Sequence, residues 1–181
     1  TKLVPVKFDP SAECQTWIAF LEKIMGGKED MIIFLQKAVG YSLTANTQEQ
    51  CMFILHGTGA NGKSTFLNTI EALFADYAQQ TPTETLMAKK NEGIRNDIAR
   101  LQGTRFVTAS EADQGKSFAE SLIKQMTGGD KLTARFLHGE FFEFIPKFKL
   151  FLATNHRPNI RGTDNGIWRR LRLIPFDVTI P

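Results

Sequence analysis

Short apolar segments alternate with segments of helical periodicity from Cys51 onward. Four apolar runs of strand length predict strands at 51–56, 104–109, 149–154 and 171–176. Apolar residues recur at helical spacing in the intervening segments 63–76, roughly 91–101, and 117–127. This alternation predicts an α/β fold, because helices that follow strands pack back onto the sheet that those strands build.

The first 48 residues have a different pattern, which predicts two helices. Residues 11–25 carry apolar side chains at helical spacing, and Ser11 is the expected N-cap. Residues 28–41 predict a second helix that stops at Gly40. We therefore divide the chain into a helical lead-in, 1–48, and a core, 49–181.

Residues 134–145, "ARFLHGEFFEFI", predict a β-hairpin. Two apolar residues precede a turn that we expect at His138-Gly139-Glu140, and three phenylalanines follow it. Extended apolar arms on both sides of a glycine-containing turn are typical of such hairpins.

Composition excludes some classes of protein. The chain has 181 residues, of which 42% are hydrophobic and 23% charged, as in a folded globular domain and unlike a disordered chain. The apolar runs are too short to span a membrane, and no signal peptide opens the chain. Two cysteines indicate ordinary reduced thiols and a cytoplasmic setting. The net charge of +3 permits a nucleic-acid partner without demanding one.

The segment "CMFILHGTGANGKSTFLNTI" has the strand, glycine-rich turn and helix of a phosphate-binding loop. Glycines allow close backbone approach, so that successive N–H groups and the helix N-terminus can cradle a phosphate. Lys63 would reach the β- and γ-phosphates, and Ser64 would offer a hydroxyl to Mg²⁺. The loop residues expected to bind the nucleotide are Gly57, Thr58, Gly59, Ala60, Asn61 and Gly62, followed by Lys63 and Ser64.

Polar residues follow two further predicted strands. One strand leads to Ser110-Glu111, with Asp113 just beyond, and the other leads to Asn155. Because ligands bind at the carboxyl ends of parallel strands, Glu111 could help to hold Mg²⁺ and polarise an attacking water. The amide of Asn155 could orient that water. Taken without the loop, these residues are explained equally well as an acidic side chain in solvent and an asparagine that forms a turn.

The segment "GTDNGIWRRLRLIPF" and its surroundings present a cluster of arginines. The cluster comprises Arg161, Arg169, Arg170 and Arg172. An arginine that reaches the γ-phosphate of a neighbouring subunit stabilises the charge of the transition state. A surface basic cluster with salt bridges to nearby aspartates is the alternative.

In order, these pieces resemble the superfamily 3 helicase domain, and especially the phage and plasmid primase-helicase family that is related to poxvirus primase-helicases. The resemblance covers nearly the whole chain through "GTGANGKST", "DIARLQGTRFVTASE", "MTGGDKLTARFLHGEFFEFIPKFKLFLATNHRP" and "DNGIWRRLRLIPF". It implies an AAA+-like P-loop NTPase fold with a central, mostly parallel sheet and a β-hairpin before the sensor strand. It also implies an ATP- and Mg²⁺-dependent helicase that forms a ring, usually a hexamer, on single-stranded DNA.

The resemblance assigns roles at the nucleotide. Its Walker A positions fall on Lys63, Ser64 and Thr65, and its Walker B acid falls on Glu111. The sensor-1 amide falls on Asn155, and the arginine finger falls on Arg169 or Arg170. Ser110 departs from the family, which has an aspartate before the Walker B glutamate.

The resemblance also assigns the hairpin to the loop that contacts DNA in the central channel. Lys131, Arg135 and His138 are therefore the expected DNA-binding residues. His138 stands at the tip without the adjacent lysine of relatives, which predicts a weak phosphate contact from this loop.

Two other functions stay open. A small-molecule kinase or GTPase would share the loop, but "TNHRP" lacks the Asn-Lys-x-Asp end of a guanine site and no arginine-rich lid is visible. Ser110 keeps the second alternative open, a nucleotide-gated DNA-binding or scaffolding module without turnover.

The chain does not begin with methionine, so we expect a piece of a longer protein. The family resemblance places a C-terminal lid, and any primase part, outside it. We expect the whole protein to be encoded by a phage, a plasmid or an integrated element, to act in the cytosol of a bacterial host and to meet other replication proteins there.

Overall fold

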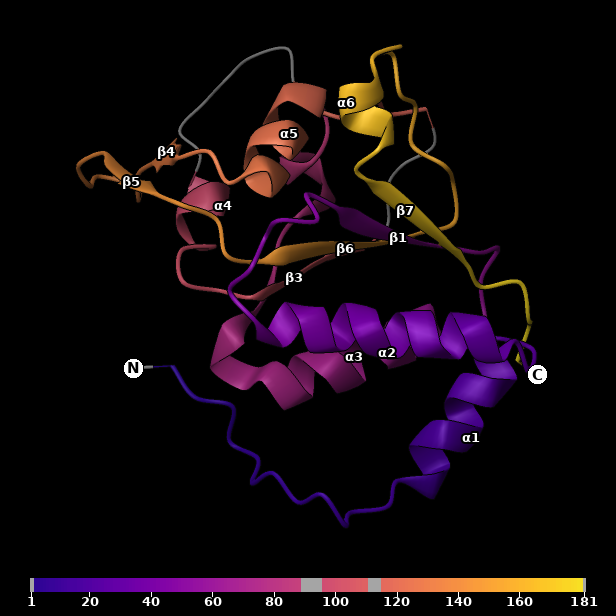
Figure 1. The fold of residues 1–181 in the computed structure, drawn as a ribbon. Coiled ribbons are helices and arrows are strands. Elements are labelled where there is room, and N and C mark those ends of the chain that lie inside the picture. The colour runs from indigo at the N-terminus through magenta and orange to yellow at the C-terminus, as the bar shows by residue number, and fades with distance from the viewer. Residues whose placement is uncertain (1, 89–95, 111–114, 181) are drawn as a thin grey trace.

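The computed structural model describes residues 2–88, 96–110 and 115–180. A five-stranded sheet lies between two layers of helices (Figure 1). The strands run in the order β2-β3-β6-β1-β7, and each neighbouring pair is parallel. The strands of this sheet are β1 (Met52–His56), β2 (Ala78–Gln80), β3 (Phe106–Ser110), β6 (Lys149–Thr154) and β7 (Leu171–Pro175).

The helices divide between the two faces of the sheet. On one face lie α1 (Gln15–Ile24), α2 (Glu29–Leu43) and α3 (Lys63–Phe74), and on the other lie α4 (Asn96–Ala99), α5 (Glu120–Gly128) and α6 (Asn165–Trp168) (Figure 1). Short 3₁₀ turns occupy Ala75–Tyr77 and Thr83–Thr85. None of the helices in the described ranges is long and apolar enough to cross a membrane.

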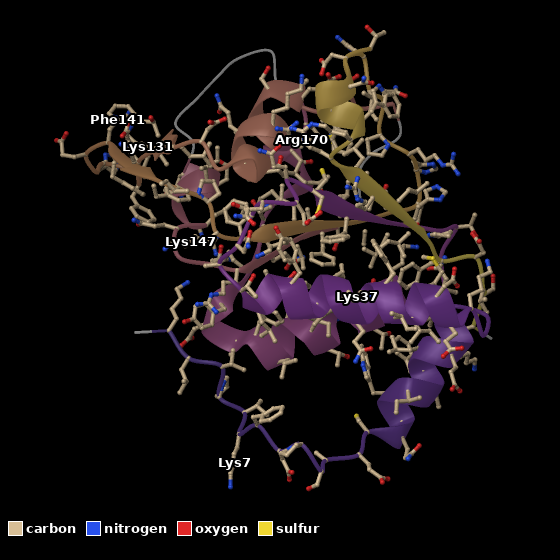
Figure 2. The ribbon with its side chains drawn as sticks, in the orientation of Figure 1. Lys7, Lys37, Lys131, Phe141, Lys147 and Arg170 are labelled. Carbon is tan, nitrogen blue, oxygen red and sulfur yellow. The ribbon has the colours of Figure 1, made fainter. Side chains whose placement is uncertain are left out.

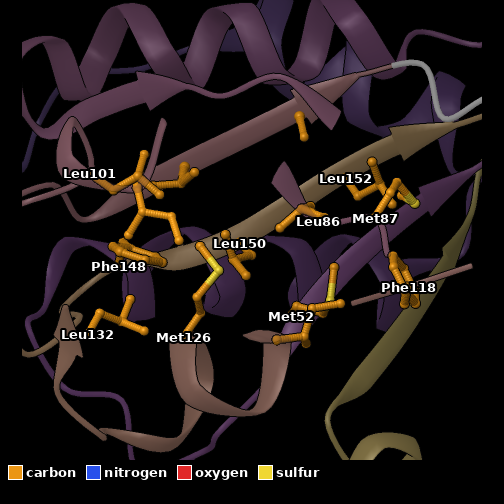
Figure 3. Close-up of a cluster of buried hydrophobic side chains, with 14 of the residues drawn as sticks. Met52, Leu86, Met87, Leu101, Phe118, Met126, Leu132, Phe148, Leu150 and Leu152 are labelled. Atoms are coloured by element: carbon orange, nitrogen blue, oxygen red, sulfur yellow. The ribbon is translucent and has the colours of Figure 1, made fainter. Parts of the chain in front are cut away.

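Alternate residues of each strand pack into two separate cores, because successive side chains of a strand point to opposite faces. Met52 and Ile54 of β1 join the cluster under α5, which Figure 3 shows around Leu150 and Leu152 of β6. Phe53, one position further along β1, joins the cluster under α1, α2 and α3. The Phe53 and Phe151 rings stack there with centroids 4.6 Å apart. A sheet buried on both faces explains why its strands are continuous apolar runs.

The sequence-based prediction of the core strands is confirmed to within two residues at each end. Two short elements, β2 and α6, were not predicted, because three or four residues are too few to establish a periodicity. The predicted helix 91–101 is described only from Asn96, where α4 begins. The predicted helix 117–127 is α5.

Two predicted boundaries of the lead-in helices are wrong. The first helix begins at Gln15 instead of following Ser11, whose amide and hydroxyl bond to Asp9 Oδ1 at 2.9 and 2.6 Å. The second helix does not stop at Gly40 but continues to Leu43. A glycine within a helix costs only about 1 kcal/mol relative to alanine, and the burial of Ser42 beyond it offsets that cost.

The predicted hairpin is present, but its pairing and its turn differ from the expectation. Its strands are β4 (Leu132–Ala134) and β5 (Phe142–Phe144), which pair antiparallel. The turn lies at 136–139, where Gly139 N–H donates to the Phe136 carbonyl at 2.9 Å. The hairpin projects from the body beside α4 (Figure 1).

Candidate functional site

Residues 57–62 connect the end of β1 to the first turn of α3 and form a tight loop. Gly57 must be glycine, because a Cβ there would lie 2.2 Å from Asn61 Nδ2 and 2.2 Å from the Phe176 carbonyl oxygen. Gly62 has φ +82°, a left-handed conformation that favours glycine, and it immediately precedes the helix. The loop therefore ends directly at the N-terminus of α3, whose first N–H groups suit an anion.

Lys63 is the first residue of α3, and its side chain folds back into the loop. Its Nζ donates to the Gly57 carbonyl oxygen at 2.8 Å, to Asn61 Oδ1 at 2.7 Å and to Asn155 Oδ1 at 3.0 Å. Within the described ranges no carboxylate pairs with this ammonium group. Burial lowers the pKa of Lys63.

A cavity of about 300 Å³ opens in front of this lysine. It is lined by residues 59–65 together with Ser110, Ala153, Thr154 and Asn155. β1 lies between β6 and β7, so the loop after β1 sits beside the tip of β6, and β3 is the next strand beyond. The sheet order thus brings the loop, Asn155 and Ser110 to one cavity at the carboxyl edge of the sheet, as the sequence predicts. Ser64 and Thr65 are exposed there.

Two cations lie near the end of β1, next to the loop. The pKa of His56, at the end of β1, is lowered chiefly by burial and further by the nearby charges of Arg157 and Lys63, whereas the charge of Asp177 acts in the opposite direction. Cations at this edge of the sheet would attract an anion.

The predicted Walker B acid, Glu111, lies outside the described residues, as does Asp113. Ser110 is the last residue of β3 and borders the cavity. In the described part of the chain no group of three or more His, Cys, Asp or Glu side chains could hold a metal ion.

Arg169 and Arg170 lie at the opposite edge of the sheet from Lys63. The Arg170 carbonyl accepts from Met52 N–H, at the start of β1, at 2.8 Å. Arg170 is 8% exposed, and its Nε donates to Thr127 Oγ1 at 3.1 Å. Burial and the charge of Arg169 lower the pKa of Arg170. Arg169 is exposed and bonds to Gln50 Oε1, so the structure does not bring either arginine to the cavity of its own chain.

The two other arginines of the cluster make local contacts. Arg161 Nε donates to Ser117 Oγ at 3.1 Å, and an Arg172 guanidinium nitrogen donates to the Arg169 carbonyl at 2.6 Å. Among the described residues no salt bridge joins these arginines to Asp164 or Asp177, and Asp164 pairs with Lys124 at 2.8 Å.

Of the three residues predicted to bind DNA, Arg135 and His138 lie on the hairpin and Lys131 immediately precedes β4. Lys131 is exposed and pairs with Glu143 at 3.2 Å across the two strands. The Arg135 guanidinium lies over the Phe141 ring, 4.7 Å from its centroid. His138 occupies the turn with φ +62°.

Comparison with known proteins identifies the family. Residues 55–170 match a family model described as "Family of unknown function (DUF5906)". The chain belongs to this family. The match runs from the end of β1 to Arg170 and includes the loop, Asn155 and the hairpin.

Viral replication proteins are among the relatives of this DUF5906 chain. It is 32% identical over 159 residues to a "putative helicase" of Acanthamoeba polyphaga mimivirus, and 30% identical over 168 residues to a "putative helicase" of Frog virus 3. A "putative primase" of African swine fever virus is 25% identical over 166 residues. These matches cover 87%, 90% and 90% of this chain but only 16%, 17% and 16% of the relatives. The resemblance to primase-helicases is confirmed.

A solved structure shares the fold. The apo A form of the NrS-1 C-terminal region superposes with a TM-score of 0.71 at 12% identity, over 96% of this chain and 40% of that one. At this identity the match establishes the arrangement of helices and strands only.

One feature of the DUF5906 site was missed in the sequence. The segment after β7 returns to the loop, where Ile180 N–H donates to the Ala60 carbonyl at 2.6 Å. Asn61 Nδ2 donates to the Phe176 carbonyl at 2.9 Å, so this asparagine joins the chain's end to Lys63. No sequence signal marks these contacts, because they join positions more than a hundred residues apart.

Proposed function

We propose that this chain is the ATP-hydrolysing core of a replicative helicase that moves on single-stranded DNA as a ring. The observation that carries the proposal is the bond between Lys63 and Asn155 at the mouth of the cavity. It joins the two residue types that a nucleotide site needs at this edge, one to bind a phosphate and one to orient water. Relatives described as putative helicases and primases support the same reading.

The residues around the cavity fit a triphosphate. The N–H groups of the loop and the N-terminus of α3 would hold the β-phosphate, and Lys63 would bridge to the γ-phosphate. Ser64, exposed beside the cavity, would offer its hydroxyl to Mg²⁺, with Glu111 as the expected partner. When bound, Mg²⁺ would neutralise the charge that develops on the phosphates.

A phosphate could replace the present partners of Lys63, and we infer that this exchange is part of ATP turnover. A phosphate oxygen would compete with the neutral acceptors Asn61 Oδ1 and Asn155 Oδ1 for the ammonium group, because bonds between charged groups are stronger. Release of Asn155 from Lys63 would leave its carbonyl oxygen free to accept from the attacking water. Glu111 is the expected group to take the proton of that water.

A ring would complete the site between neighbouring subunits. Arg169 is the better candidate for the finger, because Arg170 is buried and bonded within its own chain to Thr127. An exposed arginine at the amino edge of the sheet can reach only another subunit's phosphates, which is what a finger in trans requires. Arg170 would then help to hold Arg169 in position.

Steady-state ATP hydrolysis with and without single-stranded DNA tests the proposal, with Asn155→Ala as the matched variant. Asn155 contacts Lys63 from outside the loop, so its truncation should leave ATP binding nearly unchanged and lower turnover by about 10²-fold or more. Strong stimulation by DNA supports a translocase.

Other results would point to the alternatives. Hydrolysis that ignores DNA and accepts a small-molecule phosphoryl acceptor would favour a kinase. ATP binding without hydrolysis would favour a non-hydrolysing module, for which the Ser110 position is the supporting feature.

A further inference from the structure

The tip of the hairpin carries an exposed apolar patch that the phosphate chemistry of the cavity does not use. We call the aromatic tip the three residues Phe136, Leu137 and Phe141, which are 47%, 63% and 67% exposed. Figure 2 shows Phe141 on the hairpin, which projects from the body. Contiguous exposed apolar side chains usually mark an interaction site.

The rings of this tip are held in place. The Phe136 ring stacks on Phe142 at 5.6 Å and 25°, and Phe142 in turn contacts Phe144 at 6.0 Å. Phe144 is 8% exposed and belongs to the core cluster under α5. A continuous series of rings therefore connects the tip to the body, so binding to the tip would cost little conformational entropy.

Phe141 has a cation behind it. The Arg135 guanidinium lies 4.7 Å from the centroid of its ring, and Arg135 Nε is buried without a hydrogen-bond partner in the described part of the chain. The plane of an arginine guanidinium that lies on a ring holds the ring in place and adds positive charge beside it.

The charges around the tip favour a nucleic acid over a protein as its partner. Lys131 and Lys147 lie just before and just after the paired strands of the hairpin. Lys131 pairs with Glu143, whereas Lys147 is exposed with no ion pair within the described ranges. Aromatic rings together with cations that are free to bind phosphates suit single strands, because bases stack on the rings while the backbone follows the cations.

We propose that Phe141, backed by Arg135, is a stacking platform for the bases of a single-stranded nucleic acid. The proposal rests on the helicase function proposed above and specifies how its hairpin would hold the strand, through base faces more than through phosphates. Stacking tolerates any sequence, as a moving enzyme requires.

The test compares two oligonucleotides with the same phosphates, one of about 20 thymidines and one with abasic sites throughout. Fluorescence anisotropy of the chain should show about tenfold tighter binding to the first, and Phe141→Ala should remove the difference. Phe141→Leu keeps the apolar area without a π face and should behave like Phe141→Ala, whereas Phe141→Trp should keep or increase the preference. Phe141 is mostly exposed, so ATP hydrolysis without DNA should not change in any of these variants.

Two surface controls separate the contributions. Lys147→Ala should weaken binding to both oligonucleotides alike and lower the salt slope by about one. Ile145→Ala, a truncation of an exposed apolar residue at the base of the hairpin, should leave the preference intact.

Equal affinity for both oligonucleotides would overturn the stacking proposal while leaving a DNA-stimulated ATPase standing. A Phe141→Leu variant that keeps the full preference would also overturn it. No binding of either strand, together with no stimulation of hydrolysis, would remove the helicase function itself. A change in oligomeric state in Phe141→Ala without a change in affinity would assign the tip to contacts between copies instead.

Discussion

Two buried lysines lie at opposite edges of the same sheet, and their surroundings differ. Lys63 follows β1 at the carboxyl edge and is 7% exposed, whereas Lys149 begins the adjacent β6 at the amino edge and is 2% exposed. Burial lowers the pKa of both lysines. For Lys149, with a further contribution from the charge of Arg105, the pKa falls to about 8.

The two ammonium groups face different spaces. Lys149 Nζ donates to the Thr44 carbonyl at 2.7 Å and lies 4.2 Å from the centroid of the Tyr41 ring. The space around Lys149, Tyr41 and Cys51 has no room for a water molecule. Lys63 instead opens onto the cavity of about 300 Å³.

A shifted pKa alone therefore does not identify a functional lysine. The Lys149 ammonium group is occupied by contacts within the protein. It donates to the carbonyl of Thr44, the residue after α2, and lies over the ring of Tyr41 in α2. Lys63 has partners that a ligand can replace. We therefore propose that Lys149 holds the helical lead-in on the sheet and that Lys63 binds a ligand.

Lys63→Met should have the largest effect of the changes that separate the two lysines. Removing the cation from the proposed phosphate site should lower ATP turnover by 10²-fold or more, since charge stabilisation there has no replacement. Stability should change by less than about 1 kcal/mol, because a buried charge is replaced by an apolar chain of similar length. ATPase assays and thermal unfolding of the same preparation check both parts. A large loss of stability would mean that Lys63 is structural, like Lys149.

Lys149→Ala should have the opposite profile. Truncation leaves a cavity and an unpaired Thr44 carbonyl, which together should cost about 2–4 kcal/mol of stability. ATP binding should stay within about twofold, because the lysine is at the far edge of the sheet. Denaturant unfolding and nucleotide titration measure the two effects.

Lys147→Ala is the matched control for this change. Lys147 lies two residues earlier and is exposed, so its truncation should alter stability by no more than about 0.5 kcal/mol. Equal destabilisation by the two substitutions would contradict the assignment of Lys149.

The cavity at the carboxyl edge was predictable from the sequence because its residues lie at fixed offsets from strands. Lys63 opens the helix after one apolar run, and Asn155 directly follows another. Parallel strands bring such positions together whatever the details of packing. The same reasoning reached Ser110, where the described residues stop before Glu111.

The amino edge was not predictable in the same way. The choice between Arg169 and Arg170 stayed open in the sequence, because the doublet has no periodic signal. Burial against Thr127 separates them only in three dimensions. Lys149 gave no signal either, because a lysine at the start of an apolar run usually stays at the surface with its charge in water.

The pH dependence of stability gives the smallest and most specific test of Lys149. Its pKa is about 8 in the folded state and close to 10.5 in the unfolded state. Between these values the unfolded chain binds more protons, so stability should rise as pH increases from about 8 toward 10.5. The contribution of Lys149 between pH 8 and pH 9.5 should be on the order of 1 to 2 kcal/mol.

Other groups titrate in this range, so the measurement is the difference between the wild-type chain and Lys149→Met. Methionine fills similar space and has no proton to lose, so its curve should lack this rise while sharing every other contribution. Urea unfolding of both chains at several pH values between 8 and 9.5 provides the comparison. Parallel curves would show that the Lys149 ammonium is not desolvated, and the contrast with Lys63 would then rest on the cavity alone.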